Sequence, residues 1–231
     1  MLIVIDPGHG GKDPGSVSLK GDLEKDQVLR IATLLKGLEP GFKDMIKFYL
    51  TRTGDWELSL EARASLANRL QADYFISLHQ NSDPSQKGRG IEVYALAPGG
   101  EGEQLGRAIL NKMISRTGLV NRGLKFAGFA VLRLTAMPAV LCECGFLGTP
   151  EEAPVVTSYH FQQEVAMAIC EGIAEYLRLP FHPPPIASWN PEAEIEKLRQ
   201  AGLIFSPRKP DEPLNWGEFA TVINRLLERG T

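Results

Sequence analysis

The chain opens on an apolar run, LIVI at residues 2–5, that is followed at once by DPGHGG at 6–11. Apolar and β-branched residues favour a short buried strand, and the proline and glycines end that strand near Asp6. His9 therefore lies in a turn at the carboxyl end of a strand, where α/β proteins place binding and catalytic groups. For this segment alone, the alternative is a surface histidine in a flexible turn.

Two later segments repeat this arrangement. Residues 72–81 (ADYFISLHQN) predict a buried strand that reaches His79, and residues 138–146 (PAVLCECGF) predict another that carries Glu143. Strand and helix patterns alternate elsewhere, with strands indicated at 47–52 and 90–95 and helices at 24–38, 62–70, 105–114 and 165–177. This alternation predicts an α/β fold with a mostly parallel sheet flanked by helices. His9, His79 and Glu143 are then expected at one edge of that sheet.

Glu24 begins one of the helical patterns, and two histidines with a glutamate are a ligand set of catalytic zinc sites, which leave one position for water. Zinc lowers the pKa of that water to near 7 and polarises a scissile carbonyl, while a separate carboxylate takes and returns the proton. The sequence therefore offers His9, Glu24 and His79 as ligands of Zn²⁺ and Glu143 as the catalytic base.

Each carboxylate also has a purely structural interpretation. Glu24 suits the amino-terminal end of a helix dipole, and Glu143 could be held in an ion pair with Arg52 or Arg133.

Cys142 and Cys144 flank Glu143, and the alternation of side chains along a strand directs both to the opposite face. We interpret them as small core hydrophobes. Cys170 is the third and last cysteine, so a second thiol pair for a Cys-x-Cys metal site is missing. A thiol hydrolase that uses Cys144 and His79 remains an alternative.

The 231 residues carry a formal net charge of −3 and 43% hydrophobic side chains, as in an ordinary globular protein. A protein that binds nucleic acid carries a basic face, and a membrane helix needs about 20 consecutive apolar residues. We therefore expect neither nucleic acid binding nor membrane insertion. The amino terminus shows no signal-peptide pattern, which predicts synthesis in the cytoplasm without such a signal.

At the same positions the chain resembles the zinc-dependent N-acetylmuramoyl-L-alanine amidases, in the catalytic-domain type found in bacterial autolysins and phage endolysins. The resemblance covers residues 1–178. Its motifs follow in the order DPGHGG at 6–11, EKD at 24–26, TR at 51–52, Arg63 with AN at 67–68, SLHQN at 77–81 and MPAVLCECGF at 137–146. It implies a twisted six-stranded sheet wrapped by helices, with His9, Glu24 and His79 as zinc ligands and Glu143 as the catalytic glutamate.

The resemblance implies a peptidoglycan hydrolase that cleaves the amide between the lactyl group of N-acetylmuramic acid and the L-alanine of the stem peptide. Another zinc-dependent peptidoglycan peptidase or deacetylase is the nearest alternative, and an inactive wall-binding module is a further one. Such an enzyme is expected to act on the cell wall after release by phage or mother-cell lysis. Some family members carry a helix that plugs the site, but residues 83–89 are too few for one.

The remaining residues predict a separate module. The proline-rich residues 179–190 indicate a stiff linker, and residues 191–231 predict two short helices, the second with a clean apolar face. This part weakly resembles one surface-layer-homology unit. Because about 40 residues bury little core, we expect its apolar face to contact the wall polymer, the main domain or a second copy in a homodimer.

Overall fold

The computed structural model describes residues 1–184, 191–204 and 216–229. The chain divides into two compact units, Met1–Pro184 and Pro185–Thr231, which are described separately below. None of the helices in the described residues is long and apolar enough to cross a membrane.

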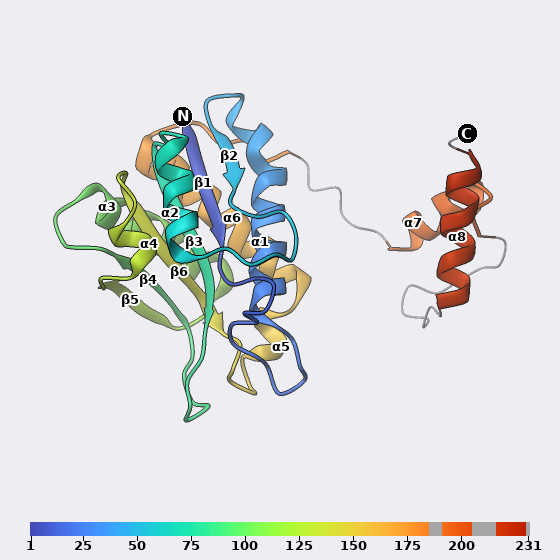
Figure 1. The fold of residues 1–231 in the computed structure, drawn as a ribbon, viewed down its shortest axis with the longest axis horizontal. Helices are drawn as coiled ribbons and strands as arrows, with labels where there is room; N and C mark the ends of the chain where they lie inside the picture. Colours follow the sequence, from blue (N-terminus) through green and yellow to red (C-terminus); the bar gives the residue numbers. More distant parts are fainter. Residues whose placement is uncertain (185–190, 205–215, 230–231) are drawn as a thin grey trace. The chain divides into compact units, whose positions relative to one another are not determined.

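The first unit is built on one six-stranded sheet (Figure 1). The strands are β1 (Leu2–Pro7), β2 (Lys47–Leu50), β3 (Tyr74–Asn81), β4 (Ile91–Ala95), β5 (Asn121–Phe126) and β6 (Ala139–Phe146). They lie in the order β2-β1-β3-β6-β4-β5, and every neighbouring pair is parallel except β4 with β6. The prediction of a mostly parallel sheet is thereby confirmed. Because β4 and β5 run in the opposite direction, their amino ends meet the carboxyl ends of β1, β3 and β6.

Helices cover both faces of this sheet. The elements are α1 (Glu24–Leu38), η1 (Glu39–Phe42), α2 (Leu60–Arg69), α3 (Glu101–Thr117), α4 (Ala130–Arg133), α5 (Ala153–Val156) and α6 (Tyr159–Leu177). Buried residues of α1, α3 and α6 form the larger core against one face, and α2 and α4 pack over a smaller core on the other. The segment between β3 and β4 contains no helix, as the sequence predicted.

Successive side chains of β6 face opposite sides of the sheet, so Glu143 and the two cysteines beside it have different surroundings. Cys142 and Cys144 are fully buried in the larger core, whereas Leu141 belongs to the smaller one. Glu143 therefore faces the side of the sheet on which α2 and α4 lie. The interpretation of both cysteines as core hydrophobes is confirmed.

β5 is the strand that the sequence pattern does not predict individually, and the short elements η1, α4 and α5 were not predicted either. The sequence of β5, NRGLKF, has no apolar run, and its residues are exposed or half-buried because it forms the outer edge of the sheet. β2 ends at Leu50 instead of the predicted Arg52. Arg52 instead turns its side chain inward, to the loop after β1.

The boundary between the two units lies beyond the first residues of the expected linker. The ring of Phe181 packs on Phe42 with 4.6 Å between centroids, and the His182 amide donates to the Gly41 carbonyl. Residues 179–184 therefore pack on the first unit, and residues 185–190 lie outside the described part.

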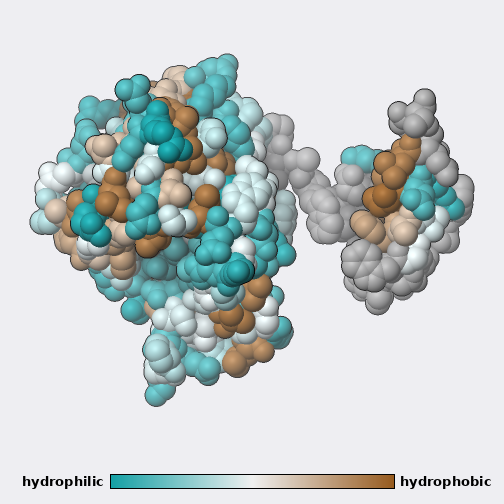
Figure 2. All heavy atoms as spheres, in the orientation of Figure 1, coloured by the Kyte–Doolittle hydropathy of each residue, from teal (hydrophilic) through white to brown (hydrophobic). Residues whose placement is uncertain are grey.

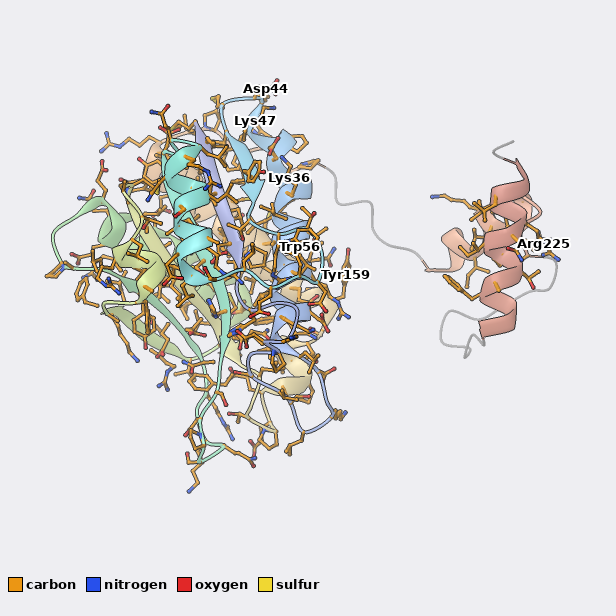
Figure 3. The ribbon with its side chains drawn as sticks, in the orientation of Figure 1. Lys36, Asp44, Lys47, Trp56, Tyr159 and Arg225 are labelled. Atoms are coloured by element: carbon orange, nitrogen blue, oxygen red, sulfur yellow. The ribbon has the colours of Figure 1, made fainter. Side chains whose placement is uncertain are left out.

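The second unit contains α7 (Pro191–Gln200) and α8 (Trp216–Arg229), in agreement with the two helices expected there. Arg225, labelled in Figure 3, donates to the Leu203 carbonyl at 2.7 Å and ties α8 to the turn after α7. Figure 2 shows an apolar stripe on this unit. The exposed large apolar side chains of α8 are Phe219, Ile223, Leu226 and Leu227.

Candidate active site

Three predicted ligands converge at the carboxyl edge of the sheet. His9 follows β1, Glu24 begins α1, and His79 lies near the end of β3. Glu24 Oε1 is 3.0 Å from His9 Nε2 and 3.1 Å from His79 Nδ1, and the two ring nitrogens are 3.2 Å apart. These three atoms of His9, Glu24 and His79 thus form a nearly equilateral triangle, which is called the ligand triangle below.

This triangle has the dimensions of one face of a metal coordination tetrahedron. With metal–ligand distances of about 2.0–2.1 Å, tetrahedral zinc holds its ligand atoms about 3.3–3.4 Å apart. The observed separations are slightly shorter, and two imidazoles with one carboxylate are donors that zinc accepts. The residues therefore fit a metal ion, and His9, Glu24 and His79 are the group in the described residues that could hold one.

The Glu24 carboxylate is fixed from both sides by backbone amides. Its Oε1 accepts from the Gln80 amide at 2.9 Å, and its Oε2 accepts from the Ser16 amide at 2.7 Å. A side chain at Gly15 would lie 2.6 Å from Oε2, and Gly15 itself adopts a positive φ of 67°. The loop before α1 therefore presses the carboxylate into the triangle and leaves one oxygen to act as ligand.

His9 is held in an uncommon backbone conformation, with φ of 60°. Its Nδ1 donates to Asp13 Oδ2 at 2.8 Å, so Nε2 is the nitrogen that faces Glu24 and His79. The Arg63 guanidinium donates to the His9 carbonyl, and Arg63 is itself buried in an ion pair with Asp6 at 2.8 Å. A left-handed conformation at a non-glycine residue persists only where its surroundings enforce it.

Arg52, like Arg63, holds this loop through hydrogen bonds to its backbone. Its guanidinium is almost completely buried and donates to the carbonyls of Pro7 at 3.0 Å, Gly8 at 2.8 Å and Lys25 at 2.7 Å. Arg52 and Arg63 both belong to the motifs of the resemblance, but the sequence pointed to no contact between either side chain and this loop. Arg52 ties the His9 loop to the start of α1, and Arg63 ties it to α2.

His79 lies directly against the backbone of this loop. A Cβ added to Gly8 would stand 2.2 Å from His79 Cε1, so only glycine leaves room for the ring. The rings of His9 and His79 meet edge to face with 4.9 Å between centroids.

Glu143 lies beside His79, because the two residues pair in register across β3 and β6. Its Oε2 is buried and has no hydrogen-bond partner, and burial raises the pKa of this carboxyl to about 7. Arg52 binds backbone carbonyls instead, so the structural alternative of a Glu143–Arg52 ion pair is wrong. No ion pair joins Glu143 to Arg133 either, within the described part of the chain.

The charges of His9, Glu24 and His79 depend on one another. Burial alone would lower the pKa of His9, but the Glu24 and Asp13 carboxylates outweigh it and raise that pKa to about 9. Burial likewise favours the neutral acid at Glu24, yet hydrogen bonds to His79 and His9 hold the pKa of Glu24 far below its usual range. The Glu24 carboxylate therefore stays ionised and stabilises positive charge at both imidazoles, since the pKa of His79 is raised by the same carboxylate; a bound cation would be stabilised in the same way.

A groove of about 520 Å³ leads to these residues. The segment that joins β2 to α2 carries Trp56, labelled in Figure 3, and its next residues, Glu57 and Leu58, line the groove. His9 and His79 are in the lining as well. The groove therefore opens onto two of the three side chains of the triangle.

The cysteine alternative does not fit this geometry. Cys144 is buried on the other face of the sheet from Glu143, and burial raises the pKa of its thiol well above the usual value. A buried, protonated thiol away from His79 has neither the access nor the ionisation of a nucleophile.

The fold and the site define an α/β protein with a cluster of two histidines and one glutamate, suited to hold a metal ion, at the carboxyl edge of its sheet. Residues 3–175 match the family described as N-acetylmuramoyl-L-alanine amidase, and the chain belongs to that family. The resemblance seen in the sequence motifs is confirmed, and residues 176–231 lie outside the match.

Individual relatives agree with this assignment. The chain is 38% identical over 183 residues to the endolysin of Bacillus phage SPP1, covering 77% of this chain and 66% of the endolysin. It is 36% identical over 180 residues to the sporulation-specific N-acetylmuramoyl-L-alanine amidase of Bacillus subtilis (78% and 69%), and 30% identical over 220 residues to AmiC of Escherichia coli O6:H1 (76% and 52%). The chain thus spans between about half and about two thirds of the length of these relatives.

Solved structures share the fold. The catalytic domain of CwlV, an N-acetylmuramoyl-L-alanine amidase from Bacillus (Paenibacillus) polymyxa, superposes with a TM-score of 0.72 at 35% identity, covering 77% of this chain and 98% of that one. The amidase AmiC2 of Nostoc punctiforme gives a TM-score of 0.72 at 37% identity, with coverage of 77% and 97%.

Proposed function

We propose that this protein is a zinc-dependent N-acetylmuramoyl-L-alanine amidase, in which His9, Glu24 and His79 hold the ion and Glu143 is the general base. The bond cleaved is the amide between the lactyl group of N-acetylmuramic acid and the L-alanine of the stem peptide. The observation that carries the proposal is the register of Glu143 beside His79, which sets an unpartnered carboxyl next to the ligand triangle.

The proposed chemistry divides between the ion and the protein. A bound zinc ion supplies a Lewis acid that polarises the scissile carbonyl and lowers the pKa of water. Glu143 accepts the proton of the attacking water and returns it to the leaving nitrogen of L-alanine as the C–N bond breaks. The pKa of about 7 suits both transfers, since the carboxyl is then readily ionised and reprotonated.

The fixed backbone of the site supports this division of roles. Arg52 and Arg63 hold the His9 loop, and the Ser16 and Gln80 amides hold Glu24. Little reorganisation is then needed when the ion or the substrate binds.

Mass spectrometry of digested, purified cell wall tests the proposal. Amidase action frees the amino terminus of L-alanine and leaves intact glycan strands with lactyl carboxylates. Another peptidase would free a different amino terminus, and a deacetylase would free none from the stem peptide. Either of these outcomes contradicts the proposal.

We further propose that unit Pro185–Thr231 anchors the enzyme on the wall through the apolar stripe on α8. The apolar stripe then contacts wall polymer. The competing alternative is that the stripe joins two copies of the protein in solution.

A further inference from the structure

A second hollow, of about 540 Å³, lies beside the ligand triangle. Glu143 pairs in register with His79 on one side and with Glu92 of β4 on the other, so the three side chains form one row on the same face of the sheet. Glu92 continues this row into the hollow, which β5 and the segment after β3 complete. Figure 1 shows that segment projecting beyond the edge of the sheet.

Glu92 is buried and accepts four hydrogen bonds. Asn81 donates to its Oε1 at 2.8 Å and Tyr94 at 2.8 Å, while Arg122 at 2.7 Å and Lys125 donate to its Oε2. Burial favours the neutral acid, but the Lys125 and Arg122 hydrogen bonds hold the pKa of Glu92 below its usual value. One ionised carboxylate therefore faces two cations.

Arg122 and Lys125 both line the hollow, and Arg122 also donates to the Arg89 carbonyl at 3.3 Å. Arg122 lies over the Phe146 ring at 4.8 Å and Lys125 over the Tyr94 ring at 5.8 Å, and each side chain remains about one third exposed. Lys87 also lines the hollow.

Asp83 is the other carboxylate in the lining. It accepts hydrogen bonds within its own turn, from the amide and the hydroxyl of Ser85 and from the Lys87 amide. Three cations thus face two carboxylates, so the hollow has a surplus positive charge.

The groove on the other side of the triangle has the opposite character. Its exposed charged side chains are carboxylates, at Asp13, Glu57 and Glu61, and its one arginine, Arg63, is buried in the ion pair with Asp6. The acidic groove and the basic hollow therefore favour parts of a substrate that differ in charge, and the hollow favours a part with a negative charge. The glycan of peptidoglycan has no charge near the scissile bond, whereas the stem peptide has carboxylates.

We propose that the hollow formed by Lys87, Arg122 and Lys125 around Glu92 binds the carboxylate of the acidic residue that follows L-alanine in the stem peptide. This inference rests on the proposed function. It orients the substrate in the site, with the stem peptide lying over β4 and β5. Arg122 and Lys125 are then specificity-determining residues for the reaction.

The distances agree with that assignment. Neighbouring strands lie about 4.8 Å apart, so Glu92, two strands from His79, lies about 10 Å from it, and Arg122 and Lys125 reach Glu92 from β5, the next strand outward. An extended chain advances about 3.5 Å per residue. The carboxylate of the second residue thus lies about 7–10 Å from the scissile carbon, within reach of both cations.

The test compares two muropeptides that differ only in whether the α-carboxylate of the second residue is free or amidated. The wild-type protein is expected to cleave the free acid with about tenfold higher kcat/KM, the size of one hydrogen bond to a charged group. Arg122→Ala and Lys125→Ala should each raise KM for the acid while kcat changes little, and the double variant should abolish the preference. Arg122→Lys, which keeps the charge, should retain part of it.

Lys112→Ala is the matched control, since it removes a cation that is paired with Glu175 between α3 and α6, on the opposite face of the sheet. It should keep the full preference. The inference is overturned if the wild type treats both substrates equally or if the double variant retains the preference.

Calorimetric binding of the two corresponding free stem peptides, one with the α-carboxylate of the second residue free and one with it amidated, reports on the hollow of the wild-type protein without turnover. Stronger binding of the acid, lost in the double variant, supports the inference, and equal binding of both peptides overturns it. Absence of cleavage of both muropeptides, by contrast, contradicts the proposed function.

Discussion

Glu143 and His79 lie opposite each other on β6 and β3, and their side chains face the same side of the sheet. The histidine completes the ligand triangle, whereas the glutamate has a buried oxygen without a partner. A buried, unpaired carboxylate oxygen costs stability, so its presence next to a potential metal site indicates a functional role.

The two glutamates of the site should respond differently to the same substitution. Glu143→Gln keeps the size of the side chain but removes the base, so we expect stoichiometric zinc and at least ~100-fold lower turnover. Glu24→Gln replaces a charged ligand, and its metal content should fall, with partial recovery of activity in excess zinc. Metal analysis and kinetics on soluble muropeptides measure both. Equal loss of zinc in the two variants would contradict the division of roles.

Removal of the metal should abolish activity, and thiol alkylation should not. We expect a strong chelator to inactivate the protein and added zinc to restore it, because the ligand triangle is the only group of its kind in the described residues. Iodoacetamide should leave most activity intact, since Cys142, Cys144 and Cys170 are all buried. Inactivation by the alkylator of a protein that resists the chelator would favour the cysteine alternative.

Much of this site was predictable because it rests on local patterns. The runs that end at His9 and His79 and the run through Glu143 have the signature of buried strands, and the strands' parallel order brings these residues together. The position of Glu24 at the first residue of α1 also follows from the helical spacing.

The supporting residues were not predictable in the same way. Glu92 lies within a short strand, and its partners Arg122 and Lys125 come from β5, about 30 residues later, in a segment without an apolar pattern. Asp13 and Arg63 act through single hydrogen bonds to His9, which no periodicity reveals. Long-range polar pairing becomes visible only once the topology is known.

The buried Arg63–Asp6 ion pair should be important for stability. Arg63→Ala leaves Asp6 buried without its partner and releases the His9 carbonyl, so we expect a loss of about 3–5 kcal/mol in the free energy of unfolding. Arg107→Ala is the control, since its ion pair with Glu103 is solvent-exposed, and it should cost no more than about 1 kcal/mol. Urea denaturation measures both values, and similar losses in the two variants would contradict the structural role of Arg63.

Truncation after Pro184 tests the proposed role of the second unit. Because residues 179–184 pack on the first unit, this end point preserves the Phe42–Phe181 contact. We expect normal cleavage of soluble muropeptides and weaker action on intact wall, as anchoring is lost while the chemistry is kept. Sedimentation analysis of both proteins distinguishes the alternative: a dimer that becomes a monomer on truncation would indicate that the apolar stripe on α8 joins two copies.

Gly8→Ala should damage the site without altering any ligand. The new methyl group would stand 2.2 Å from His79 Cε1, so the ring must leave its present position beside His9 and Glu24. We expect zinc affinity and turnover to fall together, with the fold retained. Gly37→Ala is a matched control on α1, where an added Cβ meets nothing within 4 Å, and it should stabilise the helix by about 0.5–1 kcal/mol with unchanged activity. Zinc titration and thermal unfolding of both variants check this. A Gly8→Ala protein that binds zinc normally would show that the close approach of Gly8 to His79 does not position the ligand.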